Sequence, residues 1–179
     1  MRKMRKGFTL LELLVVIGVM GLMSSMAMIA GQQTTDAARA TNIADGLEKA
    51  ASAMMMYYSD NADVIAVDGI KAIAADETAG ISAKSEAEIV AEGANAYLKK
   101  SGALVAKADS GMEGKYAVEI EGTAPAQTWW VLYTLATTDT AGIGPIMQNK
   151  TARMGLKQEA KATDAKAYEG GAVIYMQVR

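Results

Sequence analysis

The chain has 179 residues, with 18 Lys and Arg against 20 Asp and Glu, and it contains neither Cys nor His. These absences exclude zinc sites built from sulfur and imidazole, cysteine nucleophiles and Ser-His-Asp triads, so we expect no enzyme and no cofactor. The acidic balance argues against nucleic acid as a main ligand, because phosphate binding depends on clustered Lys and Arg.

The first 30 residues combine a basic leader with a long apolar segment. Residues 1–7 contain four Lys and Arg, whereas residues 8–30 contain a single ionisable side chain, that of Glu12. A helix over residues 8–30 would measure about 34 Å, enough to cross a hydrocarbon core of about 30 Å. The positive-inside rule keeps the leader in the cytoplasm and places the remaining chain outside. We therefore expect a single-pass membrane precursor.

The carboxylate of Glu12 raises the free energy of inserting such a segment into a membrane. A carboxylate at the centre of a membrane helix costs about 2.5 to 3.5 kcal/mol on insertion scales, so we expect Glu12 to have a partner and a function. A free amine on Phe8 would lie about 6 Å away along the helix and would be largely protonated at neutral pH. Opposite charges 4 Å apart attract by roughly 4 kcal/mol at an effective dielectric constant of 20.

The residues around this acid resemble the processing site of type IV prepilins and pseudopilins, in the order Lys6-Gly7-Phe8-Thr9-Leu10-Leu11-Glu12-Leu13. The resemblance covers about residues 5–31. It implies cleavage after Gly7, N-methylation of Phe8, and assembly into a helical homopolymer in which Glu12 pairs with the Phe8 amine of a neighbouring subunit.

The resemblance also implies partners and locations. The partners are a prepilin peptidase that also methylates, an inner-membrane assembly platform, an assembly ATPase, and membrane lipid before assembly. The precursor would lie in the bacterial cytoplasmic membrane with its head outside. The polymer would be an extracellular type IV pilus or, alternatively, the periplasmic pseudopilus of a type II secretion or DNA-uptake system.

An ordinary secretory signal peptide is the competing interpretation, since Ser25-Met26-Ala27 offers a small-residue cleavage site. It would leave a secreted or anchored binding module. However, the apolar region of a signal peptide runs about 7 to 15 residues and needs no acid, whereas this segment is longer and contains Glu12.

One long helix is expected from the apolar segment to about Tyr58. Residues 8–30 would form its membrane-spanning or filament-core half, and residues 31–58 an amphipathic half with an apolar stripe that covers a sheet. Gly18, Gly21 and Ser25 share another stripe, where small side chains allow close helix packing. Local melting in a filament would centre on Gly18, Gly21 or the Ser24-Ser25 pair, because helix propensity is poorest there.

Residues 59–179 predict one globular α+β head, in which the long helix packs on a small antiparallel sheet. Residues 59–63 predict a turn, with Asp60, Asn61 and Asp63 solvated rather than bound to calcium. A variable loop with a short helix follows over 64–83. Ser85 and Glu88 form a capping box for a helix over 86–99.

The carboxy-terminal half contains three strand patterns and one more helix. Strands are expected at 116–121, 127–137 and 172–178, and Gly144-Pro145 predicts a helix over 146–155. Trp129 and Trp130 are adjacent in a predicted strand and point to opposite faces. We therefore expect at most one in the core and the other at a subunit contact.

Overall fold

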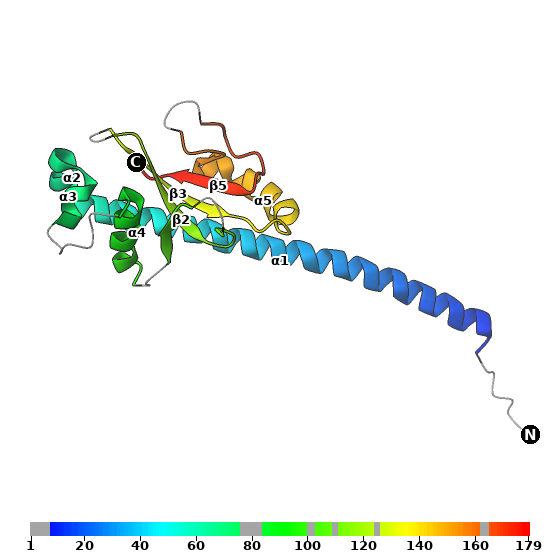
Figure 1. Cartoon of the computed structure of the whole chain (residues 1–179). Helices are drawn as coiled ribbons and strands as arrows, with labels where there is room; N and C mark the ends of the chain where they lie inside the picture. The colour runs from blue at the N-terminus through cyan, green and yellow to red at the C-terminus, as the bar shows by residue number, and fades with distance from the viewer. Residues whose placement is uncertain (1–7, 76–83, 100–102, 109–110, 124–125, 162–164) are drawn as a thin grey trace, which may run out of the picture.

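The computed structural model describes residues 8–75, 84–99, 103–108, 111–123, 126–161 and 165–179. Helix α1 (Leu10–Asp60) is 51 residues long, and its amino-terminal part projects far beyond the head (Figure 1). Residues 8–35 are exposed, and burial on one helix face begins at Ala40. The structure thus confirms one long helix whose second half packs on the head.

The end of α1 differs from the predicted turn over 59–63. The helix continues to Asp60, and the turn is reduced to Asn61, whose backbone N–H donates to the Tyr58 carbonyl and whose side-chain amide donates to the Tyr57 carbonyl. Two short helices, α2 (Ala62–Asp68) and α3 (Ile70–Ala75), then occupy the first part of the predicted loop. The rest of that loop lies outside the described residues.

Helix α4 (Glu86–Tyr97) begins at the predicted capping box and ends two residues before the predicted Lys99. The Ser85 backbone N–H donates to the Glu88 carboxylate at 2.6 Å, and the Glu88 N–H donates to the Ser85 hydroxyl at 3.3 Å. The helix packs closely on α1 because Gly93 has no side chain. A Cβ there would lie 2.1 Å from the buried Tyr57 ring.

The head contains a five-stranded sheet with the strand order β1-β2-β3-β5-β4. The strands are β1 (Leu104–Ala106), β2 (Tyr116–Glu121), β3 (Thr128–Thr134), β4 (Leu156–Lys157) and β5 (Val173–Gln177). The predicted antiparallel arrangement holds for β2, β3, β5 and β4, but β1 runs parallel to β2. Strands β1 and β4 were missed because three and two residues are too few to show a period.

Helix α5 (Thr140–Met154) begins six residues before the predicted start and contains Pro145 in its interior. The prediction was wrong because tertiary contacts outweigh the local cost of proline. A Cβ on Gly142 would lie 2.3 Å from the Asp36 carboxylate of α1, and one on Gly144 would lie 3.3 Å from the Gly170 carbonyl. The glycines let this part of the chain pack closely as a helix.

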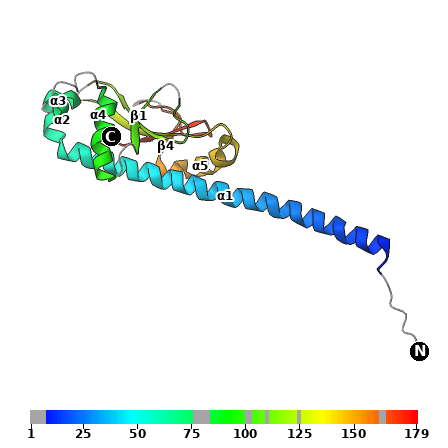
Figure 2. The ribbon, with the colours of Figure 1, turned by 60° about the horizontal axis from the view of Figure 1, so that its bottom comes forward.

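Helix α1 lies along one face of the sheet, with α4 and α5 at different places beside it (Figure 2). On this face the Tyr58 ring meets Trp129 edge-on, with 5.4 Å between ring centroids. On the opposite face Trp130 belongs to a second buried cluster with Met112, Ala117, Leu132 and Tyr175.

The expectation that at most one of the two tryptophans lies in the core was wrong. Both Trp129 and Trp130 are fully buried. Trp130 is inside because Ala160 and Ala165, from the segment that follows β4, pack over the second face of the sheet. Neither indole is therefore free to form a subunit contact or a ligand platform.

The capping box of α4 yields a test of acid stability. Hydrogen bonds from Ser85 lower the pKa of Glu88 below its ordinary value of 4.5. Because the folded-state pKa is depressed, the stabilisation is present above the unfolded-state pKa and is lost as pH falls through the folded-state value. Glu88→Gln, which keeps a capping box but cannot ionise, should be slightly less stable than wild type at neutral pH and lose less stability below about pH 4.5. Thermal melts of the detergent-solubilised chain measure this.

Two serine variants measure the contribution of the capping hydroxyl of Ser85 and compare it with loss of an exposed hydroxyl elsewhere. Ser85→Ala should cost about 1 kcal/mol at neutral pH, the usual value of an N-cap. Ser52→Ala removes an exposed hydroxyl that donates to the Glu48 carbonyl and should stay within about 0.5 kcal/mol of wild type. A Glu88→Gln melt that falls as steeply in acid as wild type would contradict this account.

Candidate functional site

The first turn of α1 holds the carboxylate of Glu12 in a capping box with Thr9. The Thr9 N–H and hydroxyl donate to Glu12 Oε2 at 2.8 and 2.9 Å, and the Glu12 N–H donates to the Thr9 hydroxyl at 3.2 Å. The carboxylate therefore turns back toward the start of the helix, next to Phe8. Thr9-x-x-Glu12 has the same spacing as Ser85-x-x-Glu88, so the pattern was available in the sequence and was overlooked.

The side chains around this carboxylate form an exposed apolar surface. The large apolar side chains from Phe8 to Ile29 are 47 to 89% exposed. Burying one such side chain contributes about 1.5 to 3 kcal/mol, so a surface of this extent requires lipid or other helices around it. The helix is also long and apolar enough to cross a membrane.

Gly18, Gly21 and Ser25 lie within this surface. A Cβ on either glycine would meet no atom within 4 Å, and the Ser25 hydroxyl donates to the Leu22 carbonyl at 2.8 Å. Helix α1 is continuous through all three positions. Within one chain, the two glycines thus leave open space for a neighbour.

The other candidate positions do not form a comparable site. The Asp60 carboxylate accepts a hydrogen bond from the Tyr97 hydroxyl and joins the ends of α1 and α4. Across the part of the chain that the structure describes, no three Asp or Glu side chains gather closely enough to hold a metal ion. Gly7 and the basic leader lie outside the described residues.

Comparison with known protein families favours one of the two interpretations of this segment. Residues 2–28 match the family model described as the prokaryotic N-terminal methylation motif. The amino-terminal segment is a type IV prepilin-like class III signal peptide. The motif supports a precursor of the type IV pilin or pseudopilin type, and the long helix packed on a mostly antiparallel sheet is a pilin-like α+β fold. No curated protein and no solved structure matches the chain.

The motif implies processing by a prepilin peptidase, and this predicts the first residue of the mature protein. We expect protein purified from its host to begin at Phe8 and to carry a methyl group on its amine. Amino-terminal sequencing and intact-mass measurement test this. A mature chain that begins at Met28 would instead support an ordinary signal peptidase and would contradict the prepilin assignment.

Proposed function

We propose that this chain is a structural subunit of a type IV pilus or pilus-like filament. In this proposal, the peptidase cleaves after Gly7, Phe8 is N-methylated, and the subunits polymerise through α1. The observation that carries the proposal is a single carboxylate, Glu12, on an otherwise apolar and exposed helix segment that lies within the methylation motif.

Cleavage would create the cation that Glu12 requires. In the precursor the Phe8 nitrogen belongs to a neutral peptide bond, whereas in the mature chain it is an amine that is largely protonated at neutral pH. Methylation keeps that charge. A precursor helix therefore offers a carboxylate but no matching cation, and only cleaved subunits offer both.

The capping box would keep Glu12 ready for its partner. Thr9 supplies two hydrogen bonds to one carboxylate oxygen, Oε2, and the other oxygen makes none among the described residues. These bonds reduce the cost of the carboxylate while a lone subunit is in the membrane. They also hold the carboxylate at the helix start, where a neighbouring amine can approach Oε1.

Helix packing would then replace lipid around α1. Gly18, Gly21 and Ser25 would allow neighbouring helices to approach closely, and any local unwinding on assembly would centre on these residues and Ser24. The head stays outside the membrane throughout. An assembly platform and an ATPase would supply the work of extraction.

The same machinery would serve an extracellular pilus or a periplasmic pseudopilus. The first would leave this chain as the main component of fibres sheared from the cell surface. The second would leave it in the envelope as part of a type II secretion or DNA-uptake system. Immunoblotting of the sheared and envelope fractions separates these two forms of the proposal.

Three variants separate the charge of Glu12 from its role as a cap. Glu12→Gln keeps the capping geometry but removes the charge, Glu12→Ala removes both, and Thr9→Val removes the hydroxyl of the cap but keeps the charge. We expect all three chains to insert in the membrane. Both Glu12 variants should lose fibre yield by about tenfold or more, equivalent to about 1.4 kcal/mol per contact, whereas Thr9→Val should still assemble.

Sheared-fibre yield, normalised to the amount of membrane-inserted subunit, measures the effect. Normal yield from Glu12→Gln would contradict the charge pairing. Loss of fibres in Thr9→Val together with normal fibres in Glu12→Gln would assign the carboxylate a capping role only.

A further inference from the structure

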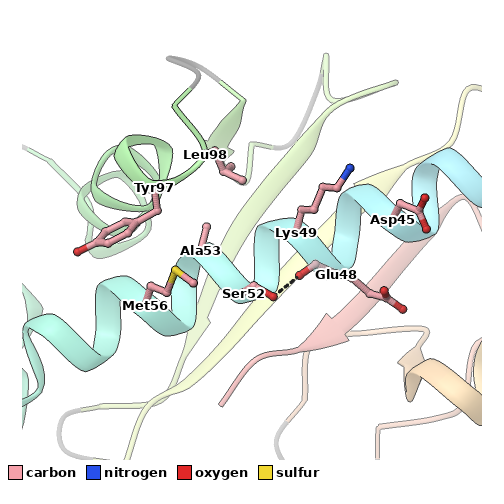
Figure 3. A pocket seen from close by; sticks show the side chains of 8 residues that line it. All are labelled: Asp45, Glu48, Lys49, Ser52, Ala53, Met56, Tyr97 and Leu98. Atoms are coloured by element: carbon pink, nitrogen blue, oxygen red, sulfur yellow. Dashed lines mark hydrogen bonds between the residues drawn. The ribbon is translucent and has the colours of Figure 1, made fainter.

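A groove of about 390 Å³ opens between α1 and the end of α4 (Figure 3). Met56 and Tyr97 give it an exposed apolar end, and Tyr97 leans over α1 from the neighbouring helix. Asp45, Glu48 and Lys49 lie farther along α1 and also line the groove. The groove thus combines an aromatic ring with an excess of negative charge.

The two carboxylates of the groove have no cationic partner in the described part of the chain. Neither Asp45 nor Glu48 forms an ion pair, although Lys49 is one turn from Asp45. Burial raises the pKa of Tyr116 to about 12, and the negative charges of its surroundings, including that of Asp45, add to the rise. An additional cation could therefore enter without displacing an existing salt bridge.

Among the described residues of the head, Arg153 differs from the other arginines in its contacts. After the leader, the chain contains three Arg residues. Arg39 pairs with Asp139 at 3.1 Å, and the Arg179 guanidinium stacks 4.1 Å from the centre of the Tyr58 ring. Arg153, in the last turn of α5, is exposed and makes neither contact with any described residue. Lys150 lies one turn before it and is also without an ion pair among the described residues.

The groove and Arg153 are chemically complementary, but they lie apart in one molecule. A guanidinium can bind carboxylates through its planar fork and can stack on an aromatic face, which are the two kinds of group that the groove presents. In both views α5 lies nearer than α4 to the projecting half of α1, so the two helices are separated along it (Figures 1 and 2). A contact between them therefore requires two molecules.

We propose that the groove of one subunit binds the end of α5 of a second copy, with Arg153 as the anchor and Lys150 beside it. The proposal rests on the filament function and deepens it by naming a contact between heads. The contact is heterologous, because each copy uses the end of α5 to contact one neighbour and its groove to contact another. Such a contact propagates from subunit to subunit and does not close after two.

Disulfide trapping tests this contact, because the natural chain has no Cys that would interfere. The test variant is Ser52→Cys with Ala152→Cys, which places one thiol in the groove and one next to an unchanged Arg153. The matched control is Ser52→Cys with Ala141→Cys, an exposed position at the opposite end of α5. Fibres of each variant are oxidised and analysed on non-reducing gels.

We expect a ladder of linked subunits from the Ala152 variant and none from the Ala141 control. Adding Arg153→Glu should reduce the ladder by about tenfold, and adding Glu48→Arg to that variant should restore much of it. The pair of charge reversals distinguishes a specific contact from simple proximity.

The failures of the two proposals are distinguishable. Fibres that form without a ladder, or with an equal ladder in the control, would overturn the head contact and leave the filament function standing. Absence of fibres from the unmodified chain, with the mature protein present in the membrane, would overturn both.

Discussion

The charge of Glu12 constrains everything else about the amino-terminal half of this protein. One carboxylate in an otherwise apolar segment is tolerable at a membrane surface, where water and the Thr9 cap can satisfy it, and is costly within a bundle of apolar helices. A neighbouring ammonium group changes that balance, because attraction between charges strengthens as water is excluded. In the proposed processing, removing the leader would therefore do more than shorten the chain, since it would supply the missing charge.

Helix α1 is one continuous helix whose two halves lie in different environments. Its exposed part needs lipid or neighbouring helices, while one face of the part from Ala40 to Tyr57 is buried against the head. Where the two parts meet, the Arg39–Asp139 ion pair and the close approach of Asp36 to Gly142 attach α1 to α5. These contacts join α1 to α5 at the point where the helix leaves the head.

The sequence predicted the features that are set locally. The apolar stripe of α1, the capping box at Ser85 and the strand at 116–121 depend on near neighbours, and the structure confirms each. Strand β1 and the early start of α5 depend on distant partners, as does the cover that buries Trp130, and no local pattern marks them. At the site, the motif identified Glu12, but its bonds to Thr9 were overlooked. Its proposed cationic partner belongs to another molecule, which one chain does not contain.

The most direct measurement is a cryo-electron microscopy map of fibres sheared from the native cell, at a resolution that shows side chains. The account predicts that the amine of Phe8 in one subunit lies within about 4 Å of the Glu12 carboxylate of its neighbour, the distance at which the pairing is strong. A map in which Glu12 contacts only its own Thr9, with the chain end directed elsewhere, would contradict the central claim.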